Sequence, residues 1–212
     1  QELPEKPLYE QIEQVSSNDL TLQSYELGAQ EYIDRTAAEV SGGFKEWLDT
    51  ALTYLSPNAD IIEIGSGFGR DANYIESFGF KVERTDATQA FVSFLQNQGF
   101  AARSFNILTD AFFGPYDLIF ANAVFLHFTP QEFEKTLEKV HGALKPEGIF
   151  AFSVKKGQGE EWTQAKLGHP RYFCYWDQKK VLSSLHKAKF EVVCLLEDDR
   201  FLQIIAKGKK DE

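Results

Sequence analysis

The sequence predicts a single α/β domain, built on a doubly wound, mostly parallel sheet of seven strands that ends in an antiparallel hairpin. Three observations lead to this prediction. Short apolar runs alternate with helical patterns, a glycine-rich turn follows the first run, and the last two runs are too close for a crossover helix. Alternating β and α units favour a parallel sheet with helices on both faces. A chain of 212 residues, 43% of them hydrophobic, can bury one such core.

The first β and α units follow a helix whose apolar residues recur at helical spacing from Phe44 until Pro57 ends the pattern. Residues 59–64 form a compact, β-branched run, which predicts a buried central strand that leads into the glycine-rich turn. The elements expected next are a helix over 70–78, a strand over 81–85, a helix over 88–97 and a strand over 100–104.

The second half of the chain continues the alternation with a strand over 117–121 and a helix over 130–140. Thr129 as N-cap, Pro130 at the first helical position and Glu132 two residues later form a capping box. The remaining expected elements are a strand over 149–154, a helix after Asp177, and strands over 190–195 and 201–206. The last two strands are joined by so few residues that they must pair as an antiparallel hairpin.

Residues 1–212 are interpreted as one domain, because no linker, internal repeat or low-complexity tract divides them. Residues 1–55 are expected to form a helical cap, and residues 56–212 the core that contains the sheet. In a doubly wound sheet, ligands bind beyond the carboxyl ends of the strands. We therefore expect the N-terminal cap to cover that edge of the sheet.

The charge balance and the apolar content exclude several classes of partner. The chain carries 22 Lys and Arg against 32 Asp and Glu, a net charge of −10, which disfavours binding to nucleic acid. No apolar stretch is long enough to span a membrane, and the polar start of the chain favours a cytoplasmic protein. Cys174 and Cys194 match no metal-binding spacing, so no metal is expected. The oligomeric state stays open.

The residues most informative about function form the glycine-rich turn over 63–69, which reads Glu-Ile-Gly-Ser-Gly-Phe-Gly. Glycine adopts positive φ and lets a ligand approach the backbone closely. The dinucleotide fingerprint G-x-G-x-x-G would need its third glycine at position 70, but that position is Arg70. The spacing is G-x-G-x-G, and an acidic residue, Glu63, precedes it.

This turn resembles the cofactor-binding turn of class I S-adenosylmethionine-dependent methyltransferases. Asp86 stands twenty-one residues after Gly65, at the expected end of the second strand, where a carboxylate can accept hydrogen bonds from both ribose hydroxyls. Residues 106–107, 116–122 and 144–148 also look like family motifs, and the resemblance extends from about residue 54 to residue 206. Residues 69–71 and 171–176 resemble segments of bacterial methyltransferases that act on small molecules.

The resemblance implies that S-adenosylmethionine is the cofactor and that its site lies along the carboxyl edge of the sheet. The residues it assigns to this site are Tyr32, Gly65, Ser66, Gly67, Arg70, Asp86, Ala87, Asn106, Ile107 and Asn122. Some of these have a structural alternative. Arg70 can meet the cofactor's carboxylate or pair with Asp71 or Glu63, and Tyr32 can close over the cofactor or belong to the core. Asn106 stands where the family often has an acidic residue.

A methyltransferase needs little more than alignment of acceptor, methyl carbon and sulfur, because the methyl group of the sulfonium is already activated. A general base helps when the acceptor is a hydroxyl or a carbon acid, and His127 is the expected catalytic residue, with His169 and Tyr172 as further candidates. The alternative for His127 is a histidine that orders its loop. The aromatic run over 172–176 can line an acceptor pocket or belong to the core.

The sequence thus predicts an enzyme that transfers a methyl group from S-adenosylmethionine to a small-molecule acceptor. Two other functions stay open: a non-catalytic protein that senses the same cofactor, and a nicotinamide-dependent oxidoreductase. A DNA amino-methylase is not indicated, because residues 122–125 read Asn-Ala-Val-Phe and lack the prolines of the D/N-P-P-Y/F tetrad.

Overall fold

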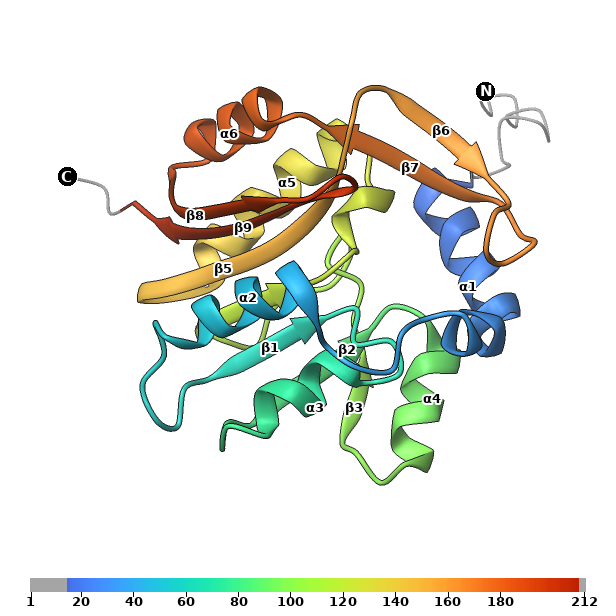
Figure 1. The fold of residues 1–212 in the computed structure, drawn as a ribbon, viewed down its shortest axis with the longest axis horizontal. Helices are drawn as coiled ribbons and strands as arrows, with labels where there is room; N and C mark the ends of the chain where they lie inside the picture. Colours follow the sequence, from blue (N-terminus) through green and yellow to red (C-terminus); the bar gives the residue numbers. More distant parts are fainter. Residues whose placement is uncertain (1–14, 210–212) are drawn as a thin grey trace, which may run out of the picture.

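The computed structural model describes residues 15–209 and contains the predicted sheet (Figure 1). Seven strands form its central part, in the order β3-β2-β1-β4-β5-β9-β8. Their bounds are β1 (Ile61–Ile64), β2 (Val82–Asp86), β3 (Ala102–Ser104), β4 (Tyr116–Ala121), β5 (Leu144–Lys156), β8 (Phe190–Glu197) and β9 (Phe201–Gly208). β9 is antiparallel to both β5 and β8, so the closing hairpin is confirmed. The strand order reverses between β1 and β4, and a ligand is expected at that point.

Helices cover both faces of this sheet. Their bounds are α1 (Ser17–Asp34), α2 (Gly42–Leu52), α3 (Arg70–Glu76), α4 (Gln89–Asn97), α5 (Pro130–Ala143) and α6 (Gln178–Lys187). α5 and α6 bury their apolar residues in one core cluster, and α2 and α3 bury theirs in a second cluster on the other face. The capping box at Thr129 and Glu132 is present, as predicted. Among residues 15–209, no helix has the length and apolar content that crossing a membrane requires.

A second hairpin was not predicted. It consists of β6 (Glu160–Thr163) and β7 (Arg171–Trp176), which pair antiparallel. β7 joins the main sheet only at the end of β5, where Lys155 and Lys156 pair with Tyr175 and Trp176. The aromatic run over 172–176 shows no alternation of apolar and polar residues, because four of its five side chains are buried. The period-2 signal of a half-exposed strand is therefore missing from the sequence.

Helix α1 crosses the carboxyl end of the sheet, and it lies beside α4 and β7 (Figure 1). Its buried residues are not an apolar stripe but Asn18, Thr21, Ser24 and Gly28. The polar side chains bond to the elements that flank the helix: the Thr21 hydroxyl accepts from the Tyr172 N–H at 3.0 Å. At Gly28 the helix is kinked, and a Cβ there would lie 3.3 Å from Leu167. α1 is thus held over the sheet edge by polar contacts.

The packing around Phe125 yields the first prediction. Phe125 is fully buried in a short 3-10 helix over 125–127, and its ring lies 5.4–6.0 Å from those of Phe128, Phe133, Phe150 and Phe152. We expect Phe125→Ala to lower the free energy of unfolding by about 3–5 kcal/mol, because it leaves a cavity in the core. Urea denaturation measures the change.

The matched control is Phe113→Ala, since the Phe113 ring is 77% exposed. The Arg103 guanidinium lies 4.2 Å from the centre of this exposed ring, and the loss of such a contact should cost less than about 1 kcal/mol. Equal effects of the two substitutions would contradict the packing described here.

Candidate active site

A cavity lies at the carboxyl edge of the sheet, between the ends of β1, β2 and β4 and the covering helix α1. It contains about 670 Å³ of space outside protein atoms, part of which is open to solvent. The residues around it are Asn18, Thr21, Leu22, Tyr25, Tyr32, Ile64, Gly65, Gly67, Asp86, Ala87, Thr88, Phe91, Phe105, Asn106, Ile107, Asn122, Ala123, Val124, His127 and Phe128.

The glycine-rich turn forms the floor of this cavity. Gly65, Gly67 and Gly69 have φ values of +74°, +54° and +90°, a backbone region that other residues rarely adopt. Ser66 fastens the turn to β2: its N–H donates to the Thr85 carbonyl at 2.8 Å, and its hydroxyl accepts from the Thr85 N–H at 3.2 Å. The side chain of Ser66 is therefore turned to β2. Ser66 was assigned to the cofactor site from the sequence, but it does not line the cavity.

Asp86 ends β2 and lines the cavity. One carboxylate oxygen accepts from the Gly67 N–H at 2.9 Å, and the other accepts from the Thr88 N–H at 2.8 Å. Burial raises the pKa of Asp86 to about 6, so the group is still ionised at neutral pH. A carboxylate has about four acceptor positions, and two remain for a ligand that offers a pair of hydroxyls.

Part of the cavity lining is apolar. It includes the buried side chains of Phe91, Phe105 and Ile107. The Asn106 amide borders it, with its oxygen accepting from the Leu108 N–H at 3.0 Å and its nitrogen donating to Asn18 at 3.3 Å. Asn106 thus ties the loop after β3 to α1, in addition to lining the cavity.

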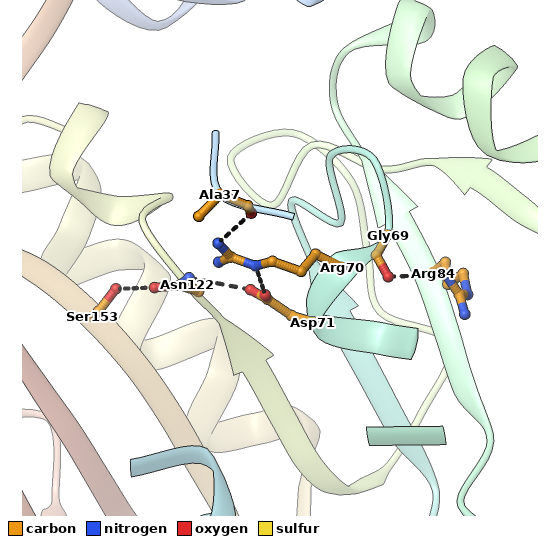
Figure 2. Close-up of polar contacts among 7 residues, drawn as sticks. All are labelled: Ala37, Gly69, Arg70, Asp71, Arg84, Asn122 and Ser153. Carbon is orange, nitrogen blue, oxygen red and sulfur yellow. Dashed lines mark hydrogen bonds and ion pairs between the residues drawn. The ribbon is translucent and has the colours of Figure 1, made fainter. Parts of the chain in front are cut away.

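Arg70 does not line the cavity, which corrects its assignment to the cofactor's carboxylate. Figure 2 shows its guanidinium between Asp71, at 2.7 Å, and the Ala37 carbonyl, at 3.1 Å. This is the alternative pairing considered from the sequence. Asp71 also accepts from the Asn122 amide at 3.1 Å, and the Asn122 oxygen accepts from Ser153 at 2.7 Å. The network fixes the orientation of Asn122 at the cavity wall.

Glu63 lies beneath the turn and does not border the cavity. Its side chain is buried, and one carboxylate oxygen has no hydrogen-bond partner among the described residues. Burial, reinforced by the nearby Asp71, raises the pKa of Glu63 to about 8. Glu63 is therefore protonated at neutral pH, which avoids two adjacent buried negative charges.

Helix α1 supplies the cover of the cavity through Tyr25 and Tyr32, whose rings pack edge to face at 5.5 Å. Tyr32 stands over the glycine-rich turn, because a Cβ at Gly67 would lie 4.0 Å from its ring. Both residues come from the same helix, and Tyr25 was not assigned to the site from the sequence. The sequence did contain a signal for Tyr25. Asn18, Thr21, Tyr25 and Tyr32 recur at helical spacing and so share one face, and an ordinary surface helix does not bury such a polar and aromatic face.

His127 borders the cavity, where its sequence position placed it. Its Nδ1 lies 2.7 Å from the Tyr172 carbonyl, which can only accept, so Nδ1 carries the proton. Its Nε2, 2.8 Å from the Tyr25 hydroxyl, is therefore the acceptor. Burial lowers the pKa of His127 to about 3, so the ring is neutral. Both nitrogens are engaged, and a catalytic role for His127 stays a prediction.

The other candidate bases are not at the cavity. His169 and Tyr172 are absent from its lining, and the Tyr172 phenol is buried behind it, where its oxygen has no partner among the described residues. The aromatic run over 172–176 is mostly core, and the Phe173 ring packs against His127 in a tilted arrangement, with 4.6 Å between ring centres. Within residues 15–209, no three His, Cys, Asp or Glu side chains are grouped so that they could hold a metal ion.

Comparisons with known proteins identify the family. A family model described as a methyltransferase domain matches residues 33–195, which is more than half of the chain. The chain therefore belongs to this methyltransferase family, and the predicted class, an S-adenosylmethionine-dependent methyltransferase, is confirmed. The alternative of a nicotinamide-dependent oxidoreductase was wrong. A search of curated proteins gave no match.

Solved structures share the fold at low sequence identity. The 1,6-didemethyltoxoflavin-N1-methyltransferase of Burkholderia thailandensis is 19% identical, with a TM-score of 0.69 over 99% of this chain and 93% of that one. The CcbJ methyltransferase of Streptomyces caelestis is 14% identical, with a TM-score of 0.70 over 88% and 98%. A methyltransferase of Methanosarcina mazei is 16% identical, with a TM-score of 0.67 over 76% and 98%.

The geometry of the turn predicts a difference between two of its glycines. A Cβ at Gly65 would lie 2.4 Å from Val124 Cγ2, whereas a Cβ at Gly67 meets no atom closer than 4.0 Å. Gly67→Ala should cost only the positive φ, about 1–2 kcal/mol. Gly65→Ala should cost about 1–3 kcal/mol more, because the new methyl group overlaps Val124.

Denaturation of a double-mutant cycle with Val124→Ala tests this explanation. Removing the Val124 methyl groups should relieve the overlap, so the cost of Gly65→Ala should shrink in the Val124→Ala background. Additive costs would show that Val124 is not the cause.

Proposed function

We propose that the cavity under α1 binds S-adenosylmethionine and that the protein transfers the methyl group to a small-molecule acceptor. The observation that carries the proposal is the position of Asp86. Its carboxylate is buried at the end of β2, is oriented by two backbone N–H groups, and keeps acceptor capacity toward the cavity. A ribose with two neighbouring hydroxyls matches this arrangement.

The remaining lining residues fit the other parts of the cofactor. We assign the adenine to the apolar lining at Phe91, Phe105 and Ile107, beside Asn106, because an aromatic base suits apolar side chains with a polar group next to them. The backbone at Gly67 is left-handed and carries no side chain. It therefore lets the methionine part of the cofactor pass close to the turn, beneath Tyr32. Ser66 and Arg70 are left out, because their side chains bond to β2 and Asp71.

The bound cofactor would supply a methyl group that is already activated on a sulfonium. The protein then has to orient and enclose the reactants. The positions of Tyr25, Tyr32 and His127 suit this role, since all three line the cavity. Alignment of this kind accounts for about 7–11 kcal/mol of a barrier in favourable cases, without a covalent step.

A small acceptor fits the way in which the cavity is enclosed. α1 passes over the sheet edge and is pinned on one side by the Thr21 contact to β7. On its other side, the Glu26 carboxylate accepts from the first backbone N–H groups of α4, at Gln89 and Ala90. A bulky polymer would have to displace this cover. The net charge of −10 also disfavours nucleic acid as acceptor.

Cofactor binding tests the proposal, with a glycine substitution as the discriminating variant. S-adenosylmethionine and S-adenosylhomocysteine should both bind and should raise the melting temperature. At a ligand concentration of 100 times the dissociation constant, the free energy of unfolding should increase by about 2.7 kcal/mol. Gly67→Ala should weaken binding of both at least about tenfold, because the methyl group points into the space we assign to the cofactor. Titration calorimetry measures both constants.

The control for this variant is Gly79→Ala. Gly79 also has a positive φ, +92°, but its Cβ would point into open space away from the cavity. Both substitutions place a Cβ on a residue with positive φ, but only position 67 lines the cavity, so only Gly67→Ala should affect the cofactor. Calorimetry that detects no binding of either compound to the wild-type protein at millimolar concentration would refute the proposed function.

Asp86 predicts a pH dependence of cofactor affinity. The ribose hydroxyls donate to the ionised carboxylate, and burial raises the pKa of that group to about 6. Affinity should therefore be constant above pH 7 and fall as the pH drops through 6, because protonation removes acceptor capacity. Asp86→Ala should weaken binding by about 1.5–3 kcal/mol, or about 10- to 150-fold, and abolish this dependence.

Calorimetry at pH 5 to 8 provides the measurement, with Glu138→Gln as control. Glu138 is an exposed carboxylate on α5 that does not border the cavity, so its loss should leave the profile unchanged. A folded Asp86→Ala protein with wild-type affinity would place the ribose elsewhere.

A further inference from the structure

Three cationic side chains lie directly behind the wall that Tyr25, Tyr32 and His127 present to the cavity. Among them, Arg171 is 6% exposed. Its Nη1 donates to the Tyr25 hydroxyl at 2.9 Å and its Nη2 to the Ala165 carbonyl at 3.0 Å. Its Nε is buried with no partner, and no carboxylate of residues 15–209 forms an ion pair with it. Arg171 is thus a buried charge without a counter-ion.

Lys166 and Lys155 complete the group, which we call the cation cluster (Arg171, Lys155 and Lys166). The Lys166 ammonium lies 4.0 Å from the centre of the Tyr32 ring and donates to Thr36 at 2.7 Å. The Lys155 ammonium lies 4.5 Å from the centre of the Phe173 ring, which itself packs against His127. Burial, followed by the charge of Arg171, lowers the pKa of both lysines, that of Lys166 to about 8.

The cation cluster is unusual for this protein. The chain has a net charge of −10, and the other buried arginine, Arg84, is paired with Glu76 at 2.6 Å. Arg70 is paired with Asp71 in the same way. A buried charge without an ion pair is costly, because it loses its hydration. For Arg171 this loss is offset only by its hydrogen bonds and by contacts with the Tyr25 and Phe173 rings. Three neighbouring cations that lack ion pairs in the described chain therefore point to a missing anion.

His127 indicates what that anion does. Its two nitrogens are occupied by the Tyr172 carbonyl and the Tyr25 hydroxyl, and the positive charges of Arg171 and Lys155 oppose its protonation. A proton taken from a neutral acceptor would add one more positive charge beside the cation cluster. An acceptor that arrives already ionised avoids this cost and supplies the negative charge that the cluster lacks.

We infer that the methyl acceptor is a small oxyanion, such as a carboxylate, which binds on the cavity side of Tyr25, is attracted by the cation cluster behind it, and reacts through its charged oxygen. This inference rests on the proposed function, since it names the substrate class of the same site. The Tyr25 hydroxyl, which accepts from Arg171, would turn its proton from His127 Nε2 to the oxyanion. The oxygen forms a bond to the methyl carbon while the carbon–sulfur bond breaks and leaves its electron pair on sulfur. The negative and positive charges cancel, and no proton is released.

Binding of matched probes tests this inference. The protein is first saturated with S-adenosylhomocysteine, and benzoate, phenylphosphonate and neutral benzamide are then titrated by calorimetry. We expect both anions to bind at least about tenfold more tightly than benzamide. In Arg171→Gln and Lys166→Gln proteins, this preference should fall to less than about threefold, while the affinity for S-adenosylhomocysteine stays within about twofold of wild type.

Lys179→Gln is the matched control, because it removes one positive charge from the exposed surface of α6. It should keep the full preference for the anions. Lys166→Gln and Lys155→Gln decide the outcome if Arg171→Gln does not fold, since both lysines are only partly buried.

Three results would overturn the inference: equal binding of benzoate and benzamide, no binding of either anion at millimolar concentration, or an undiminished preference in the cluster variants. Each of these leaves the proposed function intact as long as S-adenosylhomocysteine binds. Failure to bind S-adenosylhomocysteine would instead refute the proposed function.

Discussion

The site depends on how the left-handed turn after β1 is bonded to the end of β2. Glycine removes the steric barrier to positive φ, but it also leaves the turn without side chains that could hold it. The bonds from Ser66 to Thr85 and from Gly67 to Asp86 supply the missing constraint. Asp86 therefore has a structural task, and the bonds that hold the turn also orient its carboxylate at the cavity where we propose that the ribose binds.

The cover over this turn is unusual in its chemistry. A helix normally docks through an apolar stripe, whereas α1 buries Asn18, Thr21 and Ser24 and bonds to β7, α4 and the loop after β3. Polar contacts of this kind are worth little net free energy, because water can replace them. Aromatic contacts of Tyr25 and Tyr32 with Phe91 add to these bonds, so α1 is attached to α4 by both kinds of contact.

Charge is distributed unevenly around the cavity. Asp86 lies on the side of the sheet, with the protonated Glu63 and the Arg70–Asp71 pair behind it. The cation cluster lies on the side of α1 and β7. In a partly dry cavity, this separation orients charged ligands more strongly than it would in water. The hairpin of β6 and β7 is responsible, because it brings Arg171 next to Tyr25 on a helix 146 residues away in sequence.

The sequence by itself determined the sheet, its closing hairpin, the glycine-rich turn and the position of Asp86, because these follow from local patterns: β-branched runs, capping residues and glycine spacing. It did not determine the partners of side chains that could choose between several. Arg70 bonds to Asp71, its neighbour in sequence, and Ser66 turns to β2, and neither choice is encoded in spacing. Only the tertiary structure placed Tyr25, His127 and Arg171 in one chain of hydrogen bonds, since they come from three elements whose packing depends on long-range contacts.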